Sequence, residues 1–200
     1  MSKELLVVFT KNPVPGKVKL RLAATIGEER ALKVYQKLLK RTREAVLPLS
    51  QTVLISYSDF PDYEDLWENE KFLKSLQEGH DLGERMYNAI QLGFEKGYEK
   101  VCLIGTDIPA LDSNIIAGAF RQLQKKRAVI GPALDGGYYL IGFSHLSTGI
   151  KNIFSNKAWS TDTVYRETIR SFEIEKFTYA VLPTLADLDV ESDLPPDFPG

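Results

Sequence analysis

The chain has 200 residues, of which 44% are hydrophobic and 26% charged, as in ordinary globular proteins that bury one sizeable core. Its formal net charge of −2 excludes a protein that attracts nucleic acid through overall positive charge. Cys102 is the single cysteine, which excludes an intrachain disulfide. The length predicts one domain over residues 1–200, with an irregular, proline-containing tail from about residue 194.

Short apolar runs bounded by glycine, proline or polar residues predict the strands of this domain. We expect them at residues 5–9, 53–57, 101–104, 128–132, 138–143 and 177–182. The segment of residues 59–77 has a mixed pattern, and no helix or strand is predicted in it. The run at 138–143 follows its predecessor after a short Gly136-Gly137 break, so we expect it to be antiparallel.

Helical spacing of apolar residues separates most of these strands. One helix is expected after a capping box at Thr25–Glu28, with a buried stripe through residues 32–46. A second begins after Asp81 as N-cap, with a buried stripe of Leu82, Met86, Ala89, Ile90 and Phe94. Further helices are expected from Ser113 and from Thr161. The alternation predicts an α/β fold, a three-layer αβα domain with a mostly parallel sheet.

The amino-terminal segment has no pattern of a secretory signal peptide, and no stretch of the sequence is long and apolar enough to span a bilayer. We therefore expect a cytoplasmic protein without a membrane span. Basic residues are frequent in the amino-terminal part, whereas acidic residues are concentrated near the end.

The segment Val101–Pro109 carries the strongest functional signal. A buried strand ends in Gly105-Thr106-Asp107, and Pro109 prevents the strand from continuing. Ligands of open α/β sheets bind at the carboxyl ends of the strands. A carboxylate at that position, beside a nucleotide phosphate, is suited to a divalent cation. Asp107 is therefore the first candidate for a metal ligand.

A basic loop follows the first strand, at the same edge of the sheet. Gly16 permits close approach of the backbone to a ligand, and Lys17, Lys19 and Arg21 can neutralise phosphates. The alternative is a solvated, lysine-rich turn. The loop lacks the ending of a Walker A motif.

Four further segments each allow a functional and a plain structural interpretation. Gly79–Arg85 is either part of a nucleoside pocket or a capped helix start. Asp135-Gly136-Gly137 is either an acceptor pocket or a hairpin turn. Asp187 and Asp189 share one face of an extended segment, where one can supply a second carboxylate to the cation at Asp107, or both belong to a solvated acidic loop. Trp159 is either core packing or a lid over the acceptor.

In this order, the motifs resemble the DUF2064 family of bacterial transferases, in the nucleotide-diphospho-sugar transferase superfamily with the GT-A fold. The quoted matches are the Lys19-Leu20-Arg21-Leu22 loop end, Gly79–Arg85, Gly105–Pro109, Gly131–Tyr138, Trp159–Thr161 and Asp187–Leu194. The chain is also similar to the 2-phospho-lactate and molybdenum-cofactor guanylyltransferases. Leu20 stands where this loop commonly has serine or threonine.

The resemblance implies roles for individual residues. Asp107 and Asp189 are expected to bind Mg²⁺ or Mn²⁺, with Asp187 as the second choice after Asp189, and Asp107, Lys19 and Arg21 are expected to be catalytic. The expected nucleotide-binding residues are Phe9, Gly16, Lys17, Lys19, Arg21, Gly79, Asp81, Leu82, Arg85 and Thr106. The expected acceptor-binding residues are Asp135, Gly136, Gly137 and Trp159.

Three functions are open on this basis. The first is a metal-dependent, glycosyltransferase-like enzyme with a nucleoside diphosphate sugar as donor and a small molecule as acceptor. The second is a nucleotidyltransferase that uses a nucleoside triphosphate and releases pyrophosphate. The third is a nucleotide-binding accessory protein without turnover. The partners expected are a nucleotide donor and a small acceptor, and not nucleic acid.

Overall fold

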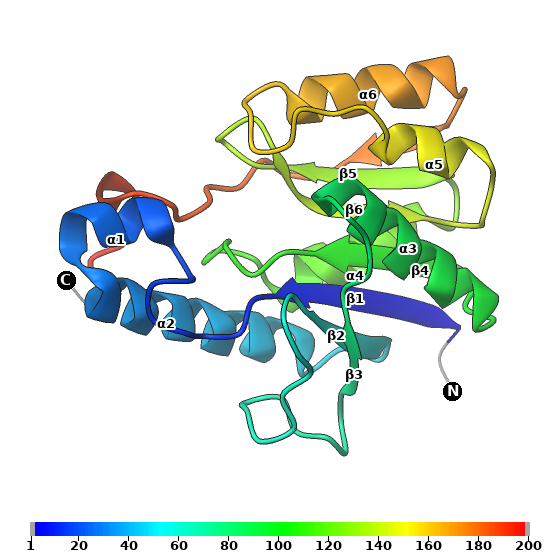
Figure 1. Cartoon of the computed structure of the whole chain (residues 1–200). Helices are drawn as coiled ribbons and strands as arrows, with labels where there is room; N and C mark the ends of the chain where they lie inside the picture. The colour runs from blue at the N-terminus through cyan, green and yellow to red at the C-terminus, as the bar shows by residue number, and fades with distance from the viewer. Residues whose placement is uncertain (1–2, 199–200) are drawn as a thin grey trace.

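The computed structural model describes residues 3–198, whose strands form one seven-stranded sheet between two layers of helices (Figure 1). The strands are β1 (Glu4–Thr10), β2 (Thr52–Tyr57), β3 (Leu73–Leu76), β4 (Lys100–Ile104), β5 (Ala128–Pro132), β6 (Tyr138–Phe143) and β7 (Tyr179–Val181). Their spatial order is β3-β2-β1-β4-β6-β5-β7. β6 runs antiparallel to both its neighbours, β4 and β5, as predicted, and the other pairings are parallel.

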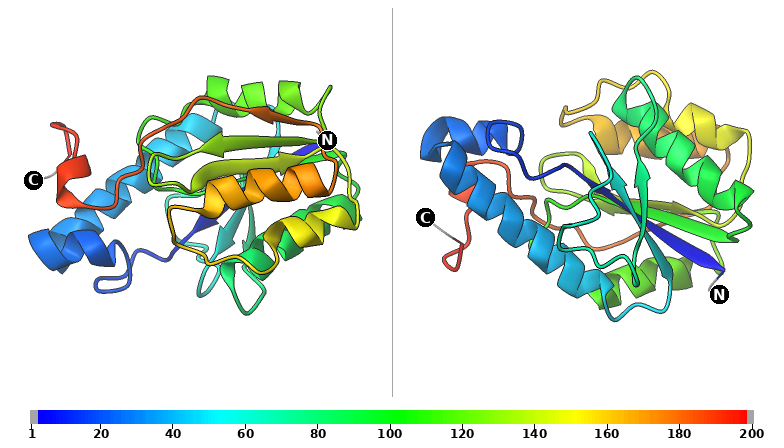
Figure 2. Two further views of the ribbon diagram at one scale, coloured as in Figure 1. Left: turned by 90° about the horizontal axis from the view of Figure 1, so that it is seen from above. Right: turned by 60° about the horizontal axis from the view of Figure 1, so that its bottom comes forward.

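The helices cover both faces of this sheet (Figure 2). They are α1 (Leu20–Ile26), α2 (Glu28–Val46), α3 (Leu82–Glu95), α4 (Ser113–Gln122), α5 (Gly149–Phe154) and α6 (Val164–Ile174), with a 3₁₀ turn at Glu191–Asp193. The apolar stripes of α2 and α4 pack on one face of the sheet, and those of α3, α5 and α6 pack on the other. The predicted three-layer αβα fold is thus confirmed. In the described part of the chain, no helix combines the length and apolarity needed to cross a bilayer.

The central strands are continuous hydrophobic runs because both of their faces are covered. Leu6 of β1 and Ile104 of β4 face the α2–α4 layer, whereas Val7 and Leu103 face the α3–α5–α6 layer. Each fully buried aliphatic side chain of this kind stabilises the fold by roughly 1.5–3 kcal/mol. This burial fixes β1 and β4 side by side and so positions the two loops that leave their carboxyl ends.

Several expected helix positions are wrong in detail. Thr25 is not part of a capping box: it lies inside α1, where its hydroxyl donates to Leu22 O at 3.0 Å, and α2 begins after Gly27. Gly27 separates α1 from α2, because its φ of 86° lies in the left-handed region and interrupts the right-handed helix. The last predicted helix begins at Val164 rather than Thr161. α1, α5 and β3 lie where no element was predicted.

Other expectations are confirmed. The Asp81 carboxylate accepts a hydrogen bond from Glu84 N at 2.8 Å and caps α3. Helix α4 begins at Ser113, after Asp112 as its N-cap. Cys102 belongs to the apolar run predicted as a strand at residues 101–104, and it is buried in β4. The chain after residue 194 is irregular up to residue 198, and the final two residues of the predicted tail lie outside the described range.

Candidate functional site

The candidate site lies where the order of the strands reverses, between β1 and β4. The chain moves from β1 to β2 and β3 on one side, and then crosses back to β4 on the other side of β1. Such a switch point leaves a crevice at the carboxyl ends of the two strands. The loop of residues 11–19 follows β1 and the turn of residues 105–109 follows β4, so the two strongest sequence motifs meet there.

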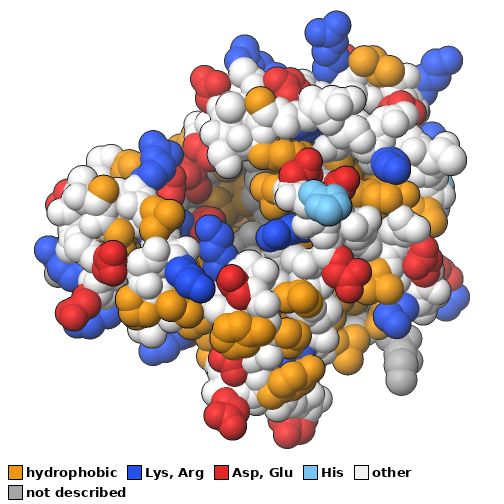
Figure 3. All heavy atoms as spheres, in the orientation of Figure 1, with side chains coloured by type: hydrophobic (Ala, Val, Ile, Leu, Met, Phe, Trp, Pro, Cys, Tyr) orange, Lys and Arg blue, Asp and Glu red, His pale blue; other side chains and the backbone are white. Residues whose placement is uncertain are grey.

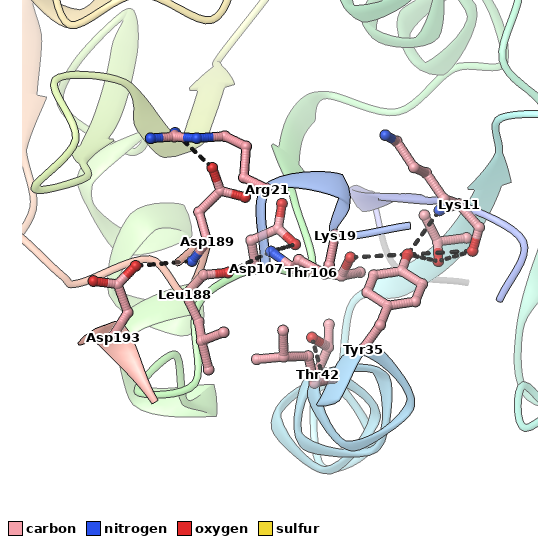
Figure 4. Close-up of polar contacts among 12 residues, drawn as sticks. Lys11, Lys19, Arg21, Tyr35, Thr42, Thr106, Asp107, Leu188, Asp189 and Asp193 are labelled. Carbon is pink, nitrogen blue, oxygen red and sulfur yellow. Dashed lines mark hydrogen bonds and ion pairs between the residues drawn. The ribbon is translucent and has the colours of Figure 1, made fainter. Parts of the chain in front are cut away.

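Lys19 is the central basic group of this crevice (Figure 4). Its backbone has φ 48° and ψ 48°, a left-handed conformation that costs a non-glycine residue about 1 kcal/mol or more. Its ammonium group lies 2.5 Å from Asp107 Oδ1 and 2.5 Å from Leu188 O, and only 4% of the side chain is exposed. The strained backbone therefore directs a buried positive charge at the carboxylate that the sequence singled out.

Asp107 is held from two sides. Its backbone carbonyl accepts a hydrogen bond from Leu188 N at 2.9 Å, and its carboxylate pairs with Lys19. Even so, 54% of the side chain is exposed. The carboxylate is therefore fixed in position and still accessible to a ligand.

A second ion pair lies beside the first. Arg21 Nη1 is 2.8 Å from Asp189 Oδ2, and the Arg21 side chain is 73% exposed. The backbone N–H of Asp189 donates to Asp193 Oδ2 at 3.0 Å (Figure 4). The backbone N–H of Val190 donates to the same oxygen at 2.9 Å, and the two bonds order the segment that carries Asp189. The basic loop is thus joined to the late acidic segment by the Arg21–Asp189 ion pair and by the hydrogen bond from Lys19 to Leu188 O, and to the turn after β4 by the Lys19–Asp107 ion pair.

These groups line a cavity of about 440 Å³, and the space-filling view shows a hollow with acidic and basic side chains at its rim (Figure 3). The lining residues are Lys19, Arg21, Leu82, Met86, Gly105, Asp107, Ile108, Ala133, Asp135, Gly137, Tyr138, Tyr139, Trp159, Ser160, Thr161, Val164, Asp187 and Asp189. The volume and the mixture of apolar walls and polar groups are those of a small-molecule site.

The cavity brings together only part of the predicted site. Nine predicted residues line it, namely Lys19, Arg21, Leu82, Asp107, Asp135, Gly137, Trp159, Asp189 and the second-choice metal ligand Asp187. Within residues 3–198, eight others are outside its lining, namely Phe9, Gly16, Lys17, Gly79, Asp81, Arg85, Thr106 and Gly136. Most of these belong to the predicted nucleotide site, and their roles stay predictions. For two of these residues the plain structural interpretation describes what is seen. Lys17 is exposed to solvent, and Asp81 caps α3.

The Asp135 turn is both a hairpin connection and a wall of the cavity. It joins the antiparallel strands β5 and β6, and Asp135 Oδ1 accepts a hydrogen bond from Gly137 N at 2.8 Å. Gly136 has a φ of 89°, and a Cβ there would lie 2.2 Å from Asp162 O. Only glycine fits this position. The turn that it makes places Asp135 in the lining of the cavity, where the Gly137 N–H holds its carboxylate.

Leu82 differs from its prediction as a buried helix residue. It is 42% exposed and lies at the cavity, because it is the first residue of α3 and precedes the part of the helix that packs on the sheet. The next residue, Gly83, lies against the Trp159 ring: a Cβ added there would be 2.7 Å from Trp159 Cζ2. Glycine therefore lets the indole pack on the start of α3 and form part of the wall.

Tyr138 and Tyr139 line the cavity and were predicted only as strand residues. Their signal is the pair of glycines just before β6, which opens the strand end to the cavity. The Tyr139 hydroxyl donates to Pro183 O at 2.9 Å, and burial raises the pKa of Tyr139 to about 12. Tyr139 is therefore protonated at neutral pH and cannot act as a general base.

Asp187 carries an unfavourable charge in this site. Burial, and then repulsion from Asp135, Asp193 and Asp189, raises the pKa of the Asp187 carboxyl above its ordinary value of 3.8. The folded chain therefore binds the Asp187 proton more tightly than the unfolded chain does. The tighter binding of this proton stabilises the folded chain at low pH, and the stabilisation is lost as the pH rises through the raised pKa of Asp187.

We accordingly expect Asp187→Asn to raise the melting temperature by about 1–2 °C at about pH 7, and to have no effect at about pH 3. The gain is small because Asp187 is only partly buried. Melting curves over this pH range test it, with Glu173→Gln on the exposed surface of α6 as the matched control. A variant that melts lower than the parent at neutral pH would show that the Asp187 charge is compensated in the fold.

The cavity offers carboxylates as possible cation ligands rather than a complete metal cage. No group of three or more His, Cys, Asp or Glu side chains within residues 3–198 is arranged to hold a metal ion. Asp107 and Asp189 are each paired with a basic side chain. Mg²⁺ is typically held by one or two carboxylates together with substrate phosphates, and carboxylate oxygen also suits Mn²⁺. The residues present fit that mode of binding.

Comparisons with known proteins agree with the fold and the motifs. The model of the family DUF2064, described as an uncharacterized protein conserved in bacteria, matches residues 39–161. A search of curated protein sequences finds no match. A crystal structure from Desulfovibrio desulfuricans G20, described as a candidate nucleotide-diphospho-sugar transferase, is 34% identical, with a TM-score of 0.86 over 95% of this chain and 84% of that chain.

More distant structures share the fold alone. The inositol-1-phosphate CTP transferase of T. maritima is 13% identical, with a TM-score of 0.57 over 98% of this chain and 92% of that chain. A Mycobacterium tuberculosis H37Rv protein in complex with manganese is 10% identical, with a TM-score of 0.52 over 95% of each chain. The family match covers the centre of the chain, and the 34% identical structure covers nearly all of it. The chain therefore belongs to the DUF2064 family and has the fold of the nucleotide-diphospho-sugar transferases.

Proposed function

We propose that this protein is a transferase that binds a nucleoside diphosphate sugar together with Mg²⁺ or Mn²⁺ and transfers the sugar to a small acceptor. The observation that carries the proposal is the pairing of Lys19 with Asp107 and of Arg21 with Asp189 at the switch point of the sheet. Cations for phosphates and carboxylates for a metal are thereby concentrated in one crevice. Family membership and the similarity to the Desulfovibrio protein support the class of enzyme.

The proposed roles follow from charge and position. Lys19 and Arg21 neutralise donor phosphates, and the exposed guanidinium of Arg21 suits a bidentate contact. Asp107 and Asp189 would hold the divalent cation, which supplies charge neutralisation at the phosphates when bound. The manganese complex of a protein with the same fold is consistent with such an ion. In this proposal, the two internal ion pairs keep all four groups ordered before the nucleotide arrives.

The part of the lining that comes from the β5–β6 turn and the segment before α6 is proposed to hold the acceptor. Asp135 and Gly137 come from the β5–β6 turn, and Trp159 comes from the segment before α6. Carboxylates accept hydrogen bonds from hydroxyl groups, and an indole ring supplies an apolar surface. Gly136 belongs to this proposal through the turn that it makes possible, although it lies outside the lining.

The chemistry proposed is positioning and electrostatic stabilisation rather than covalent catalysis. Leaving phosphates develop negative charge, and fixed positive groups lower the energy of that state more than the energy of the bound donor. Lys19 is well suited to this because its side chain is already buried and directed into the crevice. Little reorganisation is then required when the reaction occurs.

Nucleotidyl transfer is the second candidate. It is favoured by the shared fold of the inositol-1-phosphate CTP transferase, whose own reaction uses CTP. In that case the donor would be a nucleoside triphosphate, and the same basic groups would hold its outer phosphates. The released product separates the two reactions, because sugar transfer leaves a nucleoside diphosphate and nucleotidyl transfer leaves pyrophosphate.

The experiment is an incubation of the purified protein with a panel of nucleoside diphosphate sugars and nucleoside triphosphates. Each donor is tested with Mn²⁺, with Mg²⁺ and with chelator, in the presence of mixed sugars, polyols and hydroxy acids. Metal-dependent release of a nucleoside diphosphate is the expected result, and pyrophosphate release would favour the second candidate. Tight nucleotide binding without any product would instead indicate the accessory protein without turnover.

A further inference from the structure

Tyr35 has a hydroxyl group in contact with both loops of the site. It lies on α2, within the hydrophobic core, and was expected only as part of the buried stripe of that helix. Lys11 N donates to the Tyr35 hydroxyl at 2.9 Å, and the hydroxyl in turn faces Lys11 O at 3.2 Å (Figure 4). The same oxygen lies 3.2 Å from Thr10 Oγ1 and 3.4 Å from Thr106 Oγ1. One atom thus touches the end of β1 and the turn after β4.

The partners of this hydroxyl are themselves buried. Thr10 and Thr106 are almost completely covered, so water cannot readily replace the Tyr35 oxygen. Burial also raises the pKa of Tyr35, which keeps the hydroxyl protonated and able to donate. Buried, mutually satisfied polar groups of this kind fix one arrangement of the surrounding chain.

The basic loop is consequently attached to the same turn at both of its ends. At its beginning, Lys11 is joined through Tyr35 to Thr106. At its end, Lys19 is joined to Asp107, the next residue of the turn. The sequence between them contains two prolines and one glycine and makes few backbone hydrogen bonds of its own, Val14 N to Asn12 O and Lys17 N to Val14 O. The buried Asn12 side chain adds a third attachment, since it donates a hydrogen bond to Phe60 O at 3.0 Å. Together these three attachments hold the loop in place.

We propose that Tyr35 is a positioning residue for the nucleotide site: its hydroxyl fixes the start of the basic loop against Thr106, so that Lys19 and Asp107 are aligned before the donor binds. This inference rests on the proposed function for its effect on nucleotides. Its structural part, the fixing of the loop, is independent of the identity of the substrate.

The test removes the oxygen and keeps the ring, with Tyr35→Phe. The matched control is Tyr57→Phe on β2, a buried tyrosine whose hydroxyl donates to Asp65 Oδ2 at 2.6 Å, outside the lining of the cavity. Both variants keep the aromatic packing and are expected to fold with similar, modest losses of melting temperature. Only Tyr35→Phe is expected to speed hydrogen exchange at the Lys11 amide and through residues 10–19, by about tenfold or more.

The second readout is the Kd of the nucleotide that binds the parent protein most tightly. We expect Tyr35→Phe to weaken it about tenfold, and Tyr57→Phe to leave it within about twofold. Unchanged exchange at residues 10–19 together with an unchanged Kd would overturn the inference and leave Tyr35 as core packing. If the parent binds no nucleotide at all, the proposed function fails, and the exchange experiment alone still decides whether Tyr35 fixes the loop.

Discussion

Asp107→Asn is expected to lower kcat/KM of the donor reaction at least about 100-fold, because it removes the negative charge that would hold the cation at the donor phosphates. Asparagine preserves the size of the side chain and can still accept a hydrogen bond from Lys19. The Leu188 N to Asp107 O bond involves the backbone and is unaffected. A loss of activity would therefore report the charge rather than a collapse of the turn.

The measurement is steady-state release of product with Mn²⁺, beside the metal-dependent part of the shift in melting temperature on nucleotide binding. Both should fall together in Asp107→Asn. Asp59→Asn is the control, since Asp59 is an exposed carboxylate just after β2, at the same edge of the sheet but outside the cavity lining. If Asp107→Asn retains the full metal-dependent shift, Asp107 is not a ligand of the cation.

Lys19→Met is expected to weaken nucleotide binding by about 100-fold, because a charge-assisted hydrogen bond contributes about 1.5–3 kcal/mol and the lost ammonium group also leaves Asp107 repelling the phosphates. It should also lower the free energy of unfolding by about 1–2 kcal/mol, since Leu188 O loses its lysine donor. The stability cost stays moderate because water can reach the half-exposed Asp107 carboxylate.

Two further variants separate the effect of Lys19 on the stability of the fold from its effect on nucleotide binding. Arg21→Met removes a largely exposed ion pair, so its effect on the free energy of unfolding should stay below about 1 kcal/mol while nucleotide binding still weakens. Lys33→Met, on the exposed surface of α2, should change neither. Isothermal calorimetry and denaturant melts provide both quantities. Equal nucleotide affinity in Lys19→Met and the parent would remove Lys19 from the phosphate site.

The fold could be predicted from the sequence because its strongest patterns are local. The run from Val101 to Ile104 is apolar, ends in glycine and lies between amphipathic helices, so β4 and its exposed carboxyl end followed directly. Asp81 capped its helix as its spacing with Glu84 indicated. The helix start predicted at Thr25 was wrong because a capping pattern is short and occurs in other contexts. Here Thr25 lies near the end of α1, which Gly27 terminates.

The site was harder to predict because its contacts are distant in the sequence. The position of Lys19 depends on Leu188, whose backbone carbonyl accepts a hydrogen bond from the Lys19 ammonium group. Neither segment has a local sequence pattern that predicts this contact. The charge asymmetry of the sequence contained part of this information. Arg21 pairs with Asp189, and Lys37 and Arg41 pair with Asp197, so the acidic end of the chain lies against the basic amino-terminal helices.

The most direct test of the central claim is a melting experiment with a panel of nucleotides and nucleoside diphosphate sugars, each with and without Mn²⁺. A ligand at about 100 times its Kd stabilises the fold by about 2.7 kcal/mol. For a chain of this size that corresponds to a rise in Tm of about 5–10 °C. We predict such a rise for at least one nucleotide, larger with Mn²⁺ than without it. If no nucleotide shifts the Tm under either condition, the cavity at the carboxyl ends of β1 and β4 is not a nucleotide site.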